Sequence, residues 1–277
     1  MLMAVNFDSD VAFDLVRVLV GIGLFIETAE YLSIITSFGA GGIFSWKVFN
    51  AIYLQQGARG QSLLDYVFGQ QGMRALFLAR AVSVLWLFWP GLAPAQYIVP
   101  LIVAFSVGCA LNYRTAMGGD GSDQMNSIVL AGLASYALLS QSPRWQPIGL
   151  WFISLQSCLA YAASGIAKLA SPVWRGGTAP SAILNTVTYG HAPAARFLAR
   201  HRLSGVVAAW GVIIFEVAFV LCLIAPPKLV IWFLVLGATF HIANAVFMGL
   251  NVFFWSYIAT YPAILYCNGI IRDVLIR

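Results

Sequence analysis

Charged residues are scarce in this chain. Only 9% of its residues carry a charged side chain and 61% are hydrophobic, whereas ordinary soluble domains contain about 25% charged residues. The formal net charge of +5 comes without the aromatic-interleaved basic stripe that is typical of nucleic-acid-binding proteins. We therefore expect an integral membrane protein with membrane lipid as a partner and with no nucleic-acid partner.

Cysteine is also rare. The four cysteines stand singly inside apolar runs, without a CxxC motif, and no His/Cys/Asp cluster has the spacing of metal ligands. The sequence thus predicts no disulfide framework and no metal site. The N-terminal stretch MLMAVNFDSD lacks the basic region of a signal peptide, so we expect the first apolar run to be a retained membrane helix.

Long apolar runs dominate the remaining sequence. A helix needs about 20 apolar residues to cross a bilayer, and about eight segments come close to that length. They cover residues 11–36, 75–90, 95–112, 124–140, 147–168, 204–224, 229–248 and 251–268. This pattern predicts an all-α fold, a polytopic membrane bundle with about eight transmembrane helices. We expect one transmembrane domain over residues 1–277 and no extramembrane domain.

Two long connections separate these segments, residues 37–74 and 169–203. Long connections in compact helical proteins often carry function or contact a partner. The first mixes aromatic residues with Lys47 in a run too short to span a bilayer, which favours a helix lying in the membrane interface. A re-entrant piece is the alternative.

Charged residues inside apolar segments cost about 2.5–3.5 kcal/mol each, so they indicate positions facing protein or water. Glu27 and Glu30 share one helix face, and we expect one to lie at the interface and the other to pair with Arg80 or another buried cation. A paired-carboxylate acid/base site is the alternative. Glu216 lies in the middle of WGVIIFEVAFVLC and requires a proton, a cationic partner on a neighbouring helix, or a role in a proton relay.

A polar stripe runs along the segment 147–168. Ser157, Tyr161, Ser164 and Lys168 occur at positions i, i+4, i+7 and i+11, which places them on one helix face. Lys168 either extends its ammonium group to the membrane interface or lies below the surface. Burial disfavours the charged ammonium, and a neutral amine is a general base.

The segment 229–248 carries a second polar face, formed by His241 and Asn244. A lone histidine on an apolar helix is usually a structural hydrogen bonder, but the neighbouring asparagine favours a shared polar cavity. The tract GGDGSDQM at residues 118–125 is either a glycine-rich turn before a helix or, through Asp120, Asp123 and Gln124, part of a polar pocket at the membrane surface.

The run YAASGIAKLASPVWRGG and the later FHIANAVFMGLNVFFWSYIATYPAIL resemble the HTTM domain, the membrane part of vitamin K-dependent gamma-carboxylases. In that family a Gly-x-x-Lys-Leu segment followed by Trp and Gly supplies a lysine that deprotonates the reduced vitamin. The resemblance implies that Lys168 is the base and that the cofactor is a reduced quinone, menaquinone or a vitamin K-like molecule. Together with the polar faces described above, the resemblance leads us to expect Lys168 and His241 as catalytic residues, and Tyr161, Ser164, Asn244, Asp123, Gln124 and Trp174 as cofactor-binding residues.

The sequence also departs from the carboxylases. Their large extramembrane domain has no counterpart before Arg277, and Asp123 and Gln124 stand where they have an Asn-His pair. The Gly-Gly-Asp…Asp-Gln tract is closer to the sporulation-delaying protein B group, bacterial membrane proteins that mature secreted antimicrobial peptides with a small partner protein. That resemblance implies a multi-pass protein of the bacterial cell membrane.

Two functions stay open at this point. The first is a gamma-carboxylase-like, quinol-dependent enzyme in which a lysine base drives modification or maturation of a secreted antimicrobial or toxin peptide. The second is a non-catalytic scaffold or export factor, which holds a toxin precursor and its partner through the two long connections. The side of the membrane is also open, because the basic residues favour a cytoplasmic position for Lys168 and the resemblance favours the outside.

Overall fold

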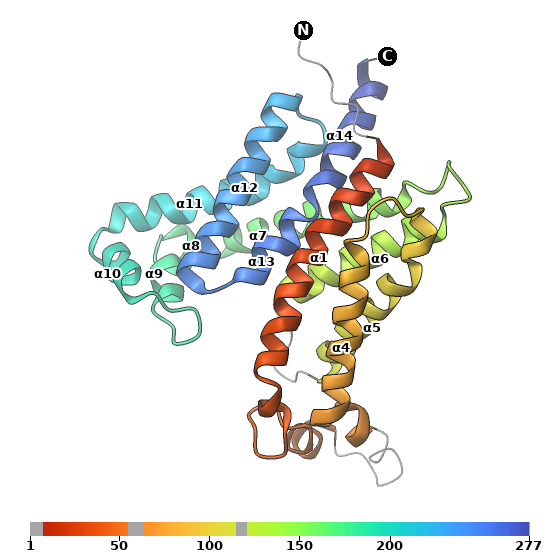
Figure 1. Cartoon of the computed structure of the whole chain (residues 1–277). Helices are drawn as coiled ribbons and strands as arrows, with labels where there is room; N and C mark the ends of the chain where they lie inside the picture. The colour runs from red at the N-terminus through yellow and green to blue at the C-terminus, as the bar shows by residue number, and fades with distance from the viewer. Residues whose placement is uncertain (1–7, 55–63, 115–120, 277) are drawn as a thin grey trace. The chain divides into compact units, whose positions relative to one another are not determined.

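A computed structural model describes residues 8–54, 64–114 and 121–276. In these ranges the regular secondary structure is helical and contains no strand (Figure 1), which confirms the predicted all-α fold. The chain divides into two compact units. We call Arg17–Gly149 the N-terminal unit, and Met1–Val16 together with Leu150–Arg277 the C-terminal unit.

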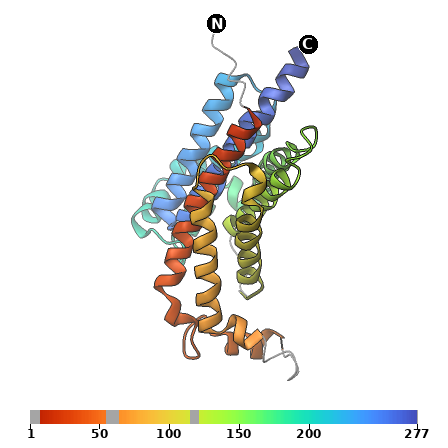
Figure 2. The same ribbon diagram turned by 45° about the vertical axis from the view of Figure 1, so that its right-hand side comes forward.

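The N-terminal unit contains most of α1 (Ser9–Ser33), followed by the long helices α4 (Gln70–Leu87), α5 (Ile98–Arg114) and α6 (Gly121–Leu138). Helix α4 packs against α5, and α5 packs against α6. Figures 1 and 2 show α1 and α4 running side by side. Shorter helical pieces join them, namely η1 (Ile35–Phe38), α2 (Trp46–Phe49), η2 (Asn50–Leu54) and η3 (Pro94–Tyr97).

An aromatic cluster forms part of the core of this unit. The rings of Tyr31 and Phe77 stack with centroids 5.1 Å apart, and Phe38 meets Phe77 edge-on at 5.5 Å. Trp46 is buried and donates its Nε1 hydrogen to Asp65 at 2.7 Å. The described part of the first long connection, residues 37–54 and 64–74, therefore contributes buried side chains to the unit, and residues 55–63 of this connection lie outside the described ranges.

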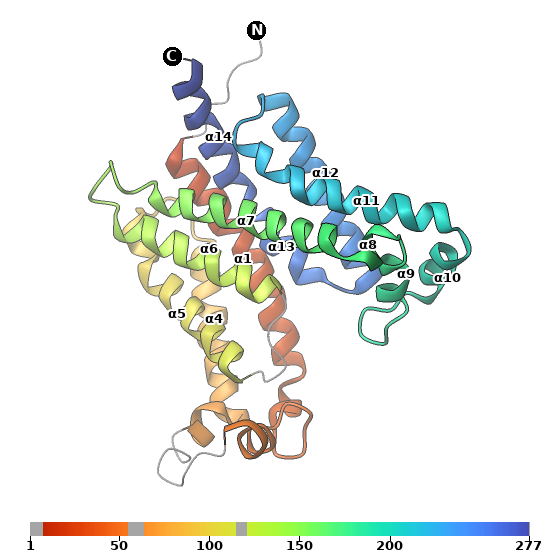
Figure 3. The same cartoon turned by 180° about the vertical axis from the view of Figure 1, so that it is seen from behind.

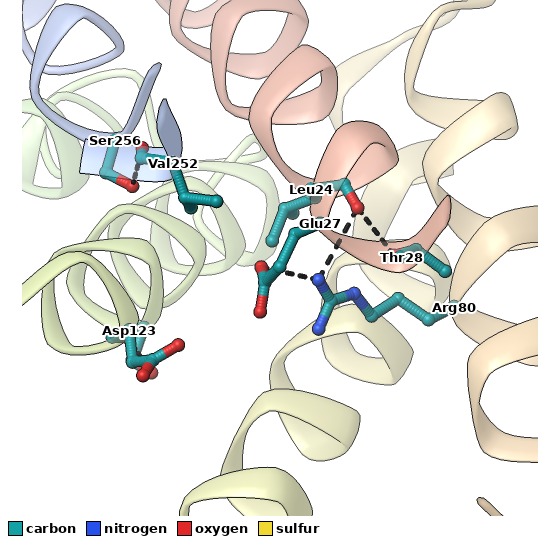
Figure 4. A network of polar contacts seen from close by, with 8 residues as sticks. Leu24, Glu27, Thr28, Arg80, Asp123, Val252 and Ser256 are labelled. Carbon is teal, nitrogen blue, oxygen red and sulfur yellow. Dashed lines mark hydrogen bonds and ion pairs between the residues drawn. The ribbon is translucent and has the colours of Figure 1, made fainter. Parts of the chain in front are cut away.

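A buried ion pair joins α1 to α4. Arg80 is 1% exposed, and its Nη2 lies 2.6 Å from Glu27 Oε2. The same guanidinium donates to the Leu24 carbonyl at 3.4 Å (Figure 4). Glu30, three residues further on, is exposed. The prediction that one glutamate pairs with Arg80 is thus confirmed.

The C-terminal unit is built on α7 (Ile148–Ala170), α11 (Arg202–Ala218) with its 3₁₀ extension η4 (Phe219–Leu223), and α12 (Pro227–Met248). Helices α13 (Asn251–Ile258) and α14 (Tyr261–Ile276) complete it, and α13 packs against α12. The second long connection folds into α8 (Pro172–Arg175), α9 (Ala179–Leu184) and α10 (Ala192–Arg200). Figure 3 shows these short helices gathered near one end of α7 and α11.

The predicted single segment 251–268 is two helices, α13 and α14, separated at Ala259 and Thr260. Pro262 is the physical reason. Proline has no amide hydrogen to continue a helix and disfavours helical geometry in the residue before it, so it is tolerated only in a first turn. Here Pro262 is the second residue of α14, and the chain therefore ends one helix and starts another.

Four helical stretches are long and apolar enough to cross a membrane, among the residues that the structure describes. They are Pro94–Arg114, Ile148–Ala170, Arg202–Leu223 and Pro227–Met248. Three of the four belong to the C-terminal unit. These stretches suggest a membrane protein, and the count of eight spans stays a prediction.

Candidate functional site

The C-terminal unit contains a partly open cavity of about 440 Å³. This volume falls within the range of about 300–1,000 Å³ that is usual for small-molecule sites. Its walls come from α7 to α13 and are mainly apolar and aromatic. The aromatic side chains are Tyr161, Trp174, Phe240, Phe247, Phe253 and Tyr257. A cavity of this kind suits a flat, largely apolar ligand.

One part of the cavity wall carries an ion pair between α7 and α11. Lys168 Nζ lies 2.7 Å from Glu216 Oε2 and 2.8 Å from Oε1, and it also donates to Ser164 Oγ. The side chain of Lys168 is 19% exposed and that of Glu216 is 5% exposed. The Glu216 carboxylate therefore holds the Lys168 ammonium against the cavity.

Gly165 allows α7 and α11 to approach closely at this point. A Cβ atom on Gly165 would lie 2.8 Å from the Val217 amide nitrogen and 2.9 Å from the Cβ of Glu216. Glycine is the residue that removes such a clash. Because Lys168 lies three residues after Gly165, nearly one helical turn further on, the close approach brings its amine within reach of Glu216.

Trp174 lies beside the ion pair. Its ring centroid is 5.2 Å from Lys168 Nζ, a distance at which an ammonium is attracted by the face of an indole ring. Trp174 comes from the short helix α8, directly after α7 ends. The second long connection thus contributes an aromatic wall next to the charged group.

A second polar contact crosses from α7 to α12. The Tyr161 hydroxyl lies 2.6 Å from His241 Nε2, and both residues are 2% exposed. Tyr161 stacks on Phe219 with centroids 3.9 Å apart, and His241 stacks on Tyr257 at 4.4 Å. This packing on both sides fixes the orientation of the phenol and the imidazole.

The polar stripe predicted on α7 finds polar partners along its length. Ser157 Oγ lies 3.0 Å from Thr260 Oγ1, at the break between α13 and α14. Tyr161 contacts His241, and Ser164 and Lys168 contact Glu216. Tyr161, Ser164 and Lys168 therefore provide the polar side of the cavity. Ser157 is not a lining residue, and its contact with Thr260 lies outside the cavity.

The structure brings together most of the residues that sequence reasoning selected. Six of them line the cavity: Tyr161, Ser164, Lys168, Trp174, His241 and Asn244. Asp123 and Gln124 do not belong to this group, because they lie on α6 of the N-terminal unit and are not among the lining residues. The third polar residue of that tract, Asp120, lies outside the described ranges.

Sequence reasoning left a proton, a cationic partner and a proton-relay role open for Glu216 and did not include it among the site residues. A signal for this was present in the sequence. Glu216 is the single acidic residue of segment 204–224, and Lys168 is the single basic residue of segment 147–168. Because isolated charges of opposite sign in apolar helices usually meet, the two could have been assigned to each other.

No group of three or more His, Cys, Asp or Glu side chains able to hold a metal ion occurs in residues 8–54, 64–114 and 121–276. Comparison with known protein families, with curated proteins and with solved structures gave no match. Fold and cavity thus define an all-helical protein with helices of membrane-spanning length. Its C-terminal unit carries an aromatic-walled cavity with a lysine–glutamate pair.

Proposed function

We propose that this chain is a multi-pass enzyme of the bacterial cell membrane that binds a reduced quinone in the cavity of its C-terminal unit. The Lys168–Glu216 pair would receive a proton from the ligand, and this reaction would drive modification or maturation of a secreted peptide. The observation that carries the proposal is the ion pair itself, which lies 2.7 Å apart in the wall of an otherwise mainly apolar cavity.

The residues present fit a quinol. Its ring is flat and apolar, which matches the aromatic walls, and its hydroxyl groups require polar partners, which the pair and the Tyr161–His241 contact offer. A bound quinol supplies an acidic hydroxyl group and an electron-rich ring. Ligands of this class partition into the bilayer, so helices of membrane-spanning length around the cavity suit their entry.

Within the pair, Glu216 is the final proton acceptor. The Lys168 ammonium donates hydrogen bonds to Glu216 and to Ser164, so in this state it has no lone pair for a proton. A ligand hydroxyl can give its proton to the carboxylate directly, while Lys168 stabilises the oxygen that loses it. Alternatively, Lys168 first passes a proton to Glu216 and then acts as the neutral base. Both routes end with the proton on Glu216.

The peptide part of the proposal is supported by the resemblance of YAASGIAKLASPVWRGG to the carboxylase segment. A mass spectrum of the secreted peptide, made with and without this protein, identifies the chemical change. We expect Lys168→Ala and Lys168→Arg each to abolish the mature product while the protein remains folded in the membrane. Full maturation with Lys168→Arg would show that a positive charge beside Glu216 is sufficient and would refute the route in which Lys168 acts as the neutral base.

Binding is tested with menaquinol-4, the reduced form of menaquinone-4, added to the purified protein without oxygen and followed by quenching of tryptophan fluorescence. We expect wild type to bind and Glu216→Gln to bind at least about tenfold more weakly, because a charge-assisted hydrogen bond is lost. Lys228→Met is the matched control, since Lys228 is an exposed lysine at the start of α12. Wild type that neither binds menaquinol-4 nor co-purifies with a quinone would refute the proposed function and leave the scaffold as the alternative.

A further inference from the structure

Three arginines lie close together where α10 meets α11. Arg196 and Arg200 belong to α10, and Arg202 is the first residue of α11, with only His201 between the two helices. All three arginines are exposed, and no side chain of the three has an ion-pair or hydrogen-bond partner among the described residues. We call these three arginines the basic corner.

No acidic residue balances this charge nearby in the sequence. Between Asp123 and Glu216 the chain contains no aspartate or glutamate, and Glu216 already pairs with Lys168. A positive charge in the first turn of a helix is also unfavourable, because the helix dipole is positive there, and Arg202 occupies this position. The basic corner therefore suits an anion that comes from outside the chain.

The two faces of α10 have different surroundings. Arg196 and Arg200 are four residues apart, so they share one helix face, and Phe197 lies beside them. Phe197 is 55% exposed. On the opposite face, Ala195 is buried and Leu198 lines the cavity. Packing of this inner face therefore holds α10 against the C-terminal unit and directs the arginine face outward.

The basic corner lies where stretches of membrane-spanning length end. The stretch Arg202–Leu223 begins in the corner, and α8 follows directly after the stretch Ile148–Ala170. His191, the residue before α10, meets Phe247 edge-on near the end of Pro227–Met248, with ring centroids 5.3 Å apart. Figure 3 shows the short helices α8 to α10 near one end of α7 and α11.

Lipid headgroups are the surroundings expected at such an end. The stretch Arg202–Leu223 has 22 residues, which makes a helix about 33 Å long, and the hydrocarbon core of a bilayer is about 30 Å thick. If this stretch spans the bilayer, its first residue lies at the level of the headgroups. Phe197 and Leu203, beside the arginines, are 55% and 76% exposed, which suits contact with acyl chains below the headgroups.

We propose that the basic corner binds the phosphate groups of anionic phospholipids, such as phosphatidylglycerol, at the membrane surface. A guanidinium group matches phosphate well, because two parallel N–H groups reach two oxygens. Basic clusters next to membrane helices attract anionic lipids. A lipid is favoured over an acidic peptide because the corner combines its charges with exposed apolar side chains at the end of a membrane-length stretch. This binding does not depend on the ligand of the cavity.

Lipid selectivity at the corner is measured with a local probe. Ala199→Cys places a cysteine at an exposed position of α10. Cys109→Ser removes the exposed native cysteine, and the other three cysteines are buried. A bimane fluorophore on the new cysteine is quenched by neighbouring lipids that carry bromine on their acyl chains. In mixed bilayers of phosphatidylglycerol and phosphatidylcholine, bromine is placed on one lipid or on the other, and the two quenching values give the relative binding constant.

We expect phosphatidylglycerol to bind at least about fivefold more strongly than phosphatidylcholine, which is the effect of one arginine near a membrane surface. In the triple variant Arg196→Gln/Arg200→Gln/Arg202→Gln, this ratio should fall to about one. The matched control is Lys228→Gln, an exposed position at the start of α12 and thus at the helix end away from Phe247; it should keep the wild-type ratio. Salt at about 1 M should lower the wild-type ratio, because it screens the charges.

Three results would overturn the proposal. A ratio near one in wild type would show that the corner does not select anionic lipid. An unchanged ratio in the triple variant would assign the selectivity to other residues. Loss of peptide maturation in the triple variant, with the lipid ratio unchanged, would assign the arginines to a peptide partner.

Thermal unfolding in neutral detergent checks that the triple variant is folded, and we expect little change because the three positions are exposed. The single change Arg200→Gln, which should also lower the ratio, keeps the test valid if the triple variant is destabilised. The lipid measurement uses no quinol, so its failure would leave the proposed function of the cavity standing.

Discussion

The Lys168–Glu216 pair predicts an asymmetric loss of stability when either partner is removed. Lys168→Met leaves the Glu216 carboxylate, with 5% of its side chain exposed, without its cation. Breaking a buried pair in this way costs about 3–5 kcal/mol. Glu216→Gln leaves the Lys168 ammonium, whose side chain is 19% exposed and retains Ser164 as a partner. We expect this change to cost less, about 1–3 kcal/mol.

The double variant Lys168→Met/Glu216→Gln tests whether the pair is the cause. Because neither charge is then stranded, we expect the double variant to lie within about 1 kcal/mol of wild type. The two single costs would sum to more than this, so the coupling energy between the positions would be about 3 kcal/mol or more. The free energy of unfolding is measured by titrating the protein in detergent micelles with sodium dodecyl sulfate. Binding of menaquinol-4 should stay weakened in the double variant although stability returns.

Lys228→Met controls for the removal of a lysine as such, since Lys228 is exposed, and exposed substitutions usually change stability by less than about 0.5 kcal/mol. A Lys168→Met variant no less stable than Lys228→Met would refute the reasoning. Costs that add in the double variant would also refute it, since they would show that the two side chains act independently.

The close helix approach and the second ion pair lead to two further predictions. Gly165→Ala should destabilise the protein by about 1–3 kcal/mol through overpacking. The control is Gly211→Ala, which should be neutral or stabilising because an added Cβ there meets nothing within 4 Å. Equal effects of the two changes in an unfolding titration would refute the role of close packing. Arg80→Met removes the cation that pairs with Glu27, whose side chain is 8% exposed, and should lower the free energy of unfolding by about 3–5 kcal/mol. A loss no greater than that caused by Arg74→Met, at an exposed position, would argue against the pair.

Apolar runs and single charges predicted much of the fold. The segment predicted at 147–168 is the helix Ile148–Ala170, and that predicted at 229–248 is Pro227–Met248, because hydrophobic length is set locally by the chain. The break inside 251–268 was missed, although Pro262 marked it. Hydropathy does not register the loss of one amide hydrogen in a continuous apolar run.

The site was predictable only in part. Helical spacing placed Tyr161 and Lys168 on one face, since that depends on the helix period alone. The partner of each depends on which helices meet, and spacing within one helix carries no such information. The assignment of Lys168 to Glu216 and of Tyr161 to His241 therefore required the tertiary arrangement, as did the observation that Asp123 and Gln124 belong to the other unit.

The pairing of one lysine with one glutamate also determines the electrostatic balance of the cavity. Their charges sum to zero, so a neutral ligand can enter mainly apolar surroundings without bringing a counter-ion. In the proposed reaction a proton would move from that ligand to Glu216 and the sum would stay zero, because the ligand's new negative charge would replace that of the carboxylate beside the Lys168 ammonium. A charged product that leaves would disturb this balance, since one positive charge would remain alone in a medium that solvates it poorly. Under the proposed function the cavity would thus favour exchange of neutral molecules and would retain the anionic form until the proton returns or the ligand has reacted.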